Sequence, residues 1–97
     1  MTVSTKSLQS YQRRLLIAHL INKGINTVPK LVKEIGIQRR TAQDTIAALS
    51  AIEIQCEFVG ANRNGYYRIK DWGGTDPRWV AEQEERFKQS LNYVQHI

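Results

Sequence analysis

Residues 27–49 read TVPKLVKEIGIQRRTAQDTIAAL, and this stretch is the most informative part of the sequence about the fold. Its apolar residues recur at helical spacing, but Gly36 interrupts them, and glycine readily takes the left-handed conformation that ends helices. Thr27 is a suitable N-cap for the first half of the stretch. The pattern therefore predicts two short helices joined by a tight turn, with the second helix beginning at Gln38 or Arg39.

The second helix of the pair is predicted to have two different faces. The inward face is small and mostly apolar, with Ala42, Thr45, Ile46 and Leu49. The outward face carries Arg39, Arg40, Gln43, Asp44 and Ala47. Arginine pairs with guanine and neutralises phosphate, and a glutamine amide pairs with adenine. A carboxylate opposes DNA unless Asp44 pairs with Arg40 or accepts a cytosine amino proton. The plainer alternative is a helix start that is only solvated.

After this helix the sequence changes to a period of two, which is typical of β-strands. From Ile52 to Phe58 the even positions are apolar, and the alternation resumes at Tyr67 after GANRNG. A β-hairpin around Asn64-Gly65 follows from this pattern, with Phe58 and Tyr67 on the same side. The connection between the strands is predicted to have from two to six residues.

Apolar helices are predicted on both sides of this region. Residues 8–23 are apolar on much of the helix surface, so this helix is expected to be buried. Asp76 and Pro77 form a helix start, and that helix is expected to extend to the C-terminus. Its apolar residues are Trp79, Val80, Phe87, Leu91, Val94 and Ile97. They either join two chains in a symmetric dimer or fold back on the first helix of their own chain.

The order of helix, helix-turn-helix and hairpin resembles a bacterial winged helix-turn-helix DNA-binding domain over about residues 10–72. The matching motifs are VPKLVKEIGIQRRTAQDTIAAL and FVGANRNGYYRI. The resemblance implies an α+β fold with three helices and a β-hairpin wing, to which this chain adds a C-terminal helix. It also implies that a recognition helix of about residues 38–51 enters the major groove. The wing, about residues 60–65, is then expected near the backbone or minor groove.

Three segments are expected: a flexible tail at 1–7, the winged domain at 8–72, and a C-terminal helix within 73–97. If the chain forms a symmetric dimer, this last helix is the dimerisation element. The residues expected at the DNA are Gln38, Arg39, Arg40, Thr41, Gln43, Asp44, Lys30, Asn62, Arg63 and Asn64. Ordinary solvation is the alternative for Lys30 and for the hairpin tip. It is the preferred interpretation for Arg13 and Arg14 in the preceding helix.

Charge and composition agree with a nucleic-acid partner. The formal net charge is +5, and the positive excess lies in residues 1–70, because residues 71–97 contain more acidic than basic side chains. Such a bias favours a polyanionic partner. The single cysteine, Cys56, excludes an internal disulfide. No apolar run approaches the roughly 20 residues that span a bilayer, and the polar N-terminus lacks a secretory signal, so a cytoplasmic location is expected.

No catalytic constellation is visible in the sequence. There is no Ser or Cys nucleophile with a plausible His base, no phosphate loop and no pair of acids with a reason to differ in pKa, so neither an enzyme nor a cofactor or metal site is expected. Two functions are left. The first is a sequence-specific double-stranded DNA-binding regulator of transcription. The second is a winged-helix adaptor that binds another protein, which Asp44 and the low total charge keep open.

Overall fold

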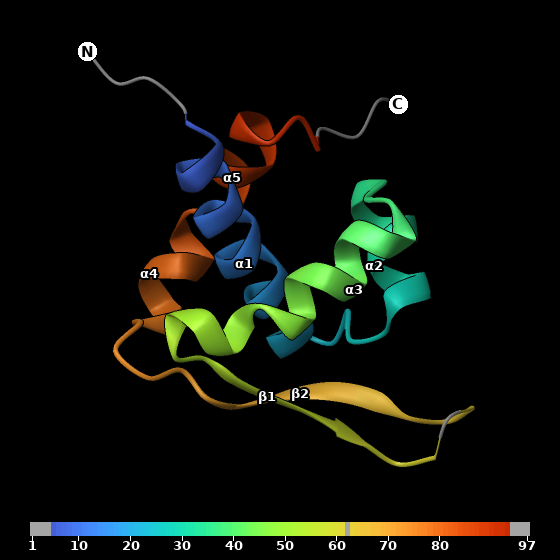
Figure 1. The fold of residues 1–97 in the computed structure, drawn as a ribbon. Coiled ribbons are helices and arrows are strands. Elements are labelled where there is room, and N and C mark those ends of the chain that lie inside the picture. The colour runs from blue at the N-terminus through green and yellow to red at the C-terminus, as the bar shows by residue number, and fades with distance from the viewer. Residues whose placement is uncertain (1–4, 62, 94–97) are drawn as a thin grey trace.

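Helix α1 (Lys6–Asn22) runs through the middle of the molecule, and the other elements pack around it (Figure 1). The computed structural model describes residues 5–61 and 63–93. The Thr5 side chain accepts the N–H of Leu8, so the helix begins at Lys6, two residues before the predicted start at residue 8. The predicted burial of this helix is confirmed, because its second half is almost without exposure at Leu15, Leu16, Ile17, Ala18, Leu20 and Ile21.

The two short helices predicted around Gly36 are present. Helix α2 (Val28–Ile35) is capped by Thr27, whose side chain accepts the N–H of Lys30 at 3.2 Å. It ends at Gly36, which has a φ of 70°, the left-handed conformation in which a side chain is strained. Helix α3 (Arg39–Ala47) then begins after a short turn. The helix-turn-helix prediction is therefore confirmed.

Helix α3 has the two faces that the sequence predicted, but it is shorter than expected. Ala42 and Thr45 are buried, and Arg39 and Gln43 are exposed. The chain continues as a 3-10 helix, η1 (Leu49–Ile52), so the recognition helix expected over about 38–51 is two helical segments. The side chain of Leu49 is fully buried, which anchors this junction in the core.

The hairpin consists of strands β1 (Gln55–Val59) and β2 (Tyr66–Asp71), which pair antiparallel. Val59 pairs with Tyr66, so the connection is residues 60–65, at the long end of the predicted range. Phe58 pairs with Tyr67, and their ring centroids lie 5.1 Å apart, which confirms that the two side chains share a side.

The strand begins later than the period of two suggested. Ile52 belongs to η1. Of the four apolar residues at even positions from Ile52 to Phe58, only Ile54 is fully buried, and it lies just before the strand. Phe58 is 46% exposed because the hairpin extends beyond the helical body (Figure 1). The alternation therefore identified which side chains share a face of the hairpin. It did not show that the outer part of the hairpin, with Phe58, lies beyond the helices and is exposed to solvent.

The C-terminal region is not the single helix that was predicted. It forms α4 (Pro77–Glu82) and α5 (Glu84–Ser90), with the expected Asp76 cap at the start of α4. Between the two helices the backbone forms a 3-10-type turn. The N–H of Gln83 donates a hydrogen bond to the carbonyl of Val80, which is three residues back instead of the four of an α-helix. The prediction of one continuous helix is wrong, and no glycine or proline marks the break in the sequence.

The C-terminal helices complete the core of their own chain. Val80 is 0% exposed, Phe87 1% and Leu91 9%, and both helices contact α1. Of the apolar residues that suggested a dimer, these three are therefore already covered, as the alternative of folding back on the first helix required. Trp79 is 43% exposed. Residues 94 and 97, which belong to the same apolar set, lie outside the described residues.

A cluster of ionic groups joins α5 to α1. A Glu84 carboxylate oxygen lies 2.6 Å from His19 Nε2 and 2.8 Å from Lys23 Nζ, and the other oxygen lies 2.8 Å from Lys88 Nζ. Burial alone would raise the pKa of Glu84, but the hydrogen bonds from these three side chains lower it to about 2. The charged form of Glu84 therefore stabilises the packing of α5 against α1.

This cluster predicts a loss of stability in acid. A folded-state pKa of about 2, below the ordinary value of 4.5, means that Glu84 stabilises the fold fully above about pH 4.5. That contribution is lost as the pH falls from about 4.5 through about 2. Glu84→Gln should therefore be less stable than the wild type at pH 7 and approach it near pH 2, as measured by urea unfolding. Glu82→Gln is the control, because Glu82 is exposed. An equal difference at both pH values would contradict this role.

Candidate nucleic-acid interface

The first turns of α3 present long polar side chains to solvent. Gln38, Arg39, Arg40 and Gln43 are exposed, whereas Thr41 is half-buried on the side that faces α1. Gln38 is the N-cap residue of α3, but its side chain makes no capping hydrogen bond. The amide and the two guanidinium groups are therefore available to bind another molecule.

Asp44 pairs with Arg40, as its position four residues later predicted. The carboxylate Oδ2 lies 3.5 Å from Arg40 Nε, and the two side chains are 68% and 86% exposed. An exposed ion pair of this kind contributes only about 0–1 kcal/mol, so Arg40 leaves it at little cost. Asp44 thus reduces the local positive charge without immobilising Arg40.

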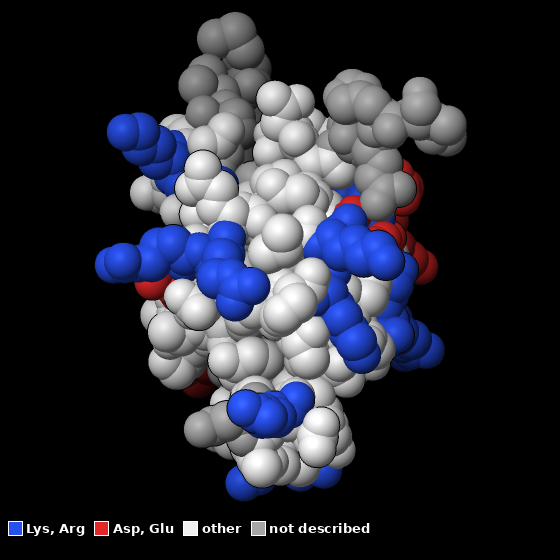
Figure 2. All heavy atoms as spheres, turned by 90° about the vertical axis from the view of Figure 1, so that its right-hand side faces the viewer, with Lys and Arg blue, Asp and Glu red and all other residues white. Residues whose placement is uncertain are grey.

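The tip of the hairpin adds a second basic element. Arg63 and Asn64 are exposed, while Asn62, which was also predicted at the site, lies outside the described residues. A Cβ at Gly65 would overlap two atoms of the Phe58 ring and lie 2.7 Å from the Ala61 carbonyl oxygen, so the tip of the hairpin packs this closely only with glycine at the position. Basic side chains gather over the helices and at the hairpin tip on one face of the molecule (Figure 2). That face is the right-hand side of Figure 1, where the hairpin tip lies.

Lys30 lies in the first turn of α2 and is exposed. Its Nζ donates to the Asn26 side-chain oxygen at 3.3 Å, an exposed contact that leaves two of its protons free. The structure therefore places Lys30 in solvent on the helix that precedes the turn, where a polyanion is able to reach it.

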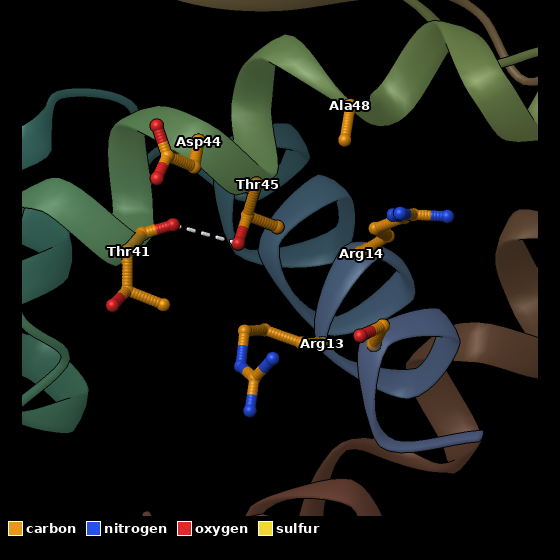
Figure 3. Close-up of a pocket in the computed structure, with 7 residues that line it drawn as sticks. Arg13, Arg14, Thr41, Asp44, Thr45 and Ala48 are labelled. Atoms are coloured by element: carbon orange, nitrogen blue, oxygen red, sulfur yellow. Dashed lines mark hydrogen bonds between the residues drawn. The ribbon is translucent and has the colours of Figure 1, made fainter. Parts of the chain in front are cut away.

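The sequence reasoning missed a pocket between α1 and α3. Arg13 and Arg14 line it from α1, together with Thr41 and Asp44 from α3, and its volume is about 300 Å³ (Figure 3). Two arginines that were interpreted as solvated are thus half-buried beside residues of the predicted interface. No local pattern indicates this pocket, because it depends on how two helices far apart in the sequence pack together.

Other groups in the described part of the chain support no further chemistry. Burial raises the pKa of the Cys56 thiol, which keeps it protonated and weakly nucleophilic. Residues 5–61 and 63–93 contain no group of three or more His, Cys, Asp or Glu side chains that could hold a metal ion. None of the described helices combines the length and the apolar character that crossing a membrane requires.

Comparison with known proteins identifies the family. Residues 6–91 match the family model described as winged helix-turn helix. A crystal structure of a DUF2131 family protein from Shewanella amazonensis SB2B has a TM-score of 0.84 and 34% sequence identity, covering 91% of this chain and 88% of that chain. No curated protein matches the chain. The chain therefore belongs to the winged helix-turn-helix family.

Proposed function

We propose that this protein is a sequence-specific double-stranded DNA-binding protein that regulates transcription in the bacterial cytoplasm. The observation that carries the proposal is the exposed start of α3, where Arg39, Arg40 and Gln43 project from the molecule without burial. Side chains that read base edges must be long, polar and free to leave solvent, and these residues meet all three requirements.

In the proposed complex α3 lies in the major groove and its buried face stays on the core. Arg40 and Gln43 contact base edges, and Lys30 contacts the phosphate backbone at the side of the groove. Arg63 and Asn64 at the wing contact the backbone or the minor groove. The acidic residue Asp44 either remains paired with Arg40 or accepts a cytosine amino proton.

A second function, binding of another protein, is favoured by a specific feature of the hairpin. Phe58 on one face of the hairpin and Tyr66 on the other are 46% and 39% exposed, and exposed aromatic rings are enriched at protein interfaces. Such an adaptor would use the wing as an apolar contact, and its basic residues would serve only solubility.

Binding to random-sequence duplex DNA across a salt series separates the two functions. For a DNA-binding protein, the logarithm of the binding constant should fall linearly with the logarithm of the salt concentration, because binding releases counterions. The slope should be about −0.9 for each phosphate contact. An adaptor should show no saturable duplex binding at low salt. That second result would contradict the proposed function.

A symmetric dimer is also part of the proposal, since two recognition helices would then read half-sites about one helical turn apart. The C-terminal helices offer such a dimer less apolar surface than the sequence suggested, because Val80 and Phe87 are buried within the chain, whereas the large side chain of Trp79 is partly exposed. Sedimentation equilibrium of the full chain at tens of micromolar is the measurement. A dimer mass is expected, and a monomer over the whole range would end the dimer prediction.

A further inference from the structure

The pocket between α1 and α3 has the chemistry of an anion site. Arg13 and Arg14 enter from α1, and Ser10 and Thr41 bring hydroxyl groups from the two helices. Within residues 5–61 and 63–93, neither arginine forms an ion pair with a carboxylate. Figure 3 shows that the Arg13 guanidinium lies on the Thr41 side of the pocket, whereas Arg14 lies nearer Ala48. Two positive charges thus line one hollow without a matching negative charge from α1.

Arg13 is held in place from the C-terminal region. Its Nε donates a hydrogen bond to the Tyr93 hydroxyl at 3.0 Å, and this contact is partly buried. An arginine has five N–H donors, so a bond through Nε leaves the four on the two terminal nitrogens free. Those two terminal nitrogens can bind a phosphate end-on in a two-point geometry, although the side-on geometry through Nε is occupied. The Tyr93 contact therefore restricts the side chain without using these two nitrogens.

The position of the pocket fits a DNA strand. Helix α3 lies between α1 and the hairpin, with the pocket on its α1 side and strand β1 on its other side (Figure 1). A helix inserted in the major groove has one sugar-phosphate strand on each side, and the wing accounts for only one of them. The second strand would pass the pocket.

We propose that this pocket binds a phosphate of the DNA backbone beside the groove occupied by α3, and that Tyr93 positions Arg13 for that contact. The inference rests on the proposed function and extends the interface to α1 and to the end of the described chain. Asp44 also lines the pocket and opposes an anion, but its single negative charge faces the two positive charges of Arg13 and Arg14. Thr45 contributes no donor, because its hydroxyl already bonds the Thr41 carbonyl at 2.7 Å.

The test measures duplex affinity and its salt dependence for variants of the full chain. Arg13→Ala should weaken binding on the order of tenfold for every duplex sequence, since a charged hydrogen-bonded contact is lost. It should also reduce the salt slope by about 1, and Arg13→Lys should restore that slope. The matched control is Arg78→Ala, which removes the same charge from an exposed position on α4, on the opposite side of the molecule from the hairpin tip (Figure 1).

Tyr93→Phe tests the positioning role, because it removes only the hydroxyl that accepts from Arg13. It should weaken duplex binding about 3- to 10-fold, the cost of immobilising a long side chain on binding, and leave the salt slope unchanged. In the Arg13→Ala background the same change should have no further effect on binding.

The possible outcomes are distinct. If Arg13→Ala and Tyr93→Phe lower the melting temperature but leave duplex affinity and salt slope unchanged, the hydrogen bond between Arg13 and Tyr93 only stabilises the fold. That result would overturn the inference. If the wild type binds duplex DNA with a steep salt slope that Arg13→Ala retains, the inference fails while the proposed function stands. If the wild type binds no duplex at all, both fail.

Discussion

Phe87→Ala is expected to lower the free energy of unfolding by about 3–5 kcal/mol, the usual cost of removing a buried aromatic ring. Phe87 is 1% exposed and packs edge to face with Trp79 at a centroid distance of 6.1 Å. A domain of this size is stable by only about 5–15 kcal/mol, so this single change should lower the melting temperature by at least about 10 °C. Thermal and urea unfolding followed by circular dichroism measure both quantities.

The control for Phe87→Ala is Tyr66→Ala, which removes a ring that is 39% exposed on the hairpin. That change should cost about 1 kcal/mol or less. A loss at Phe87 no larger than the loss at Tyr66 would mean that α5 is not part of the core. The C-terminal helices would then offer a second chain a larger apolar surface than the exposed Trp79 alone.

Arg40→Ala is expected to weaken binding to the preferred DNA sequence by roughly 1–3 kcal/mol and to relax base preference. The reason is the position of Arg40 on the exposed face of α3, where its side chain is 86% exposed and only weakly paired. Alanine is the strongest helix former, so the variant should keep the fold. Titration of the variant against preferred and random duplexes gives both quantities.

The contrast with the wing makes this prediction specific. Arg63→Ala should weaken binding to all sequences to a similar extent and reduce the salt slope by about 1, because a phosphate contact carries no sequence information. Arg78→Ala on α4 should change neither affinity nor preference. If Arg40→Ala left both affinity and preference intact, the assignment of α3 as recognition helix would be wrong.

The features predicted correctly from the sequence are those governed by short-range rules. Gly36 ends α2 because its left-handed conformation suits glycine, and Thr27 caps the same helix because its hydroxyl reaches an N–H three residues later. The two faces of α3 follow from helical periodicity, and the pairing of Phe58 with Tyr67 follows from the alternation in the strands. Each of these depends on residues close together in the chain.

The features that the sequence did not predict depend on tertiary packing. The break at Gln83 carries no glycine or proline and is defined only where α4 and α5 pack on α1. The pocket of Arg13 and Arg14 requires α1 and α3 to be neighbours, and the bond from Arg13 to Tyr93 joins residues at opposite ends of the chain. Periodicity shows which face of a helix is apolar but not which polar groups meet across two helices.

Selection of bound sequences from a pool of random duplex DNA is the direct test of whether α3 reads bases. The wild type is expected to enrich a short common sequence, and Arg40→Ala selected in parallel is expected to lose preference at one position within it. Enrichment of no sequence by a wild-type protein that is folded would contradict the claim that α3 reads DNA.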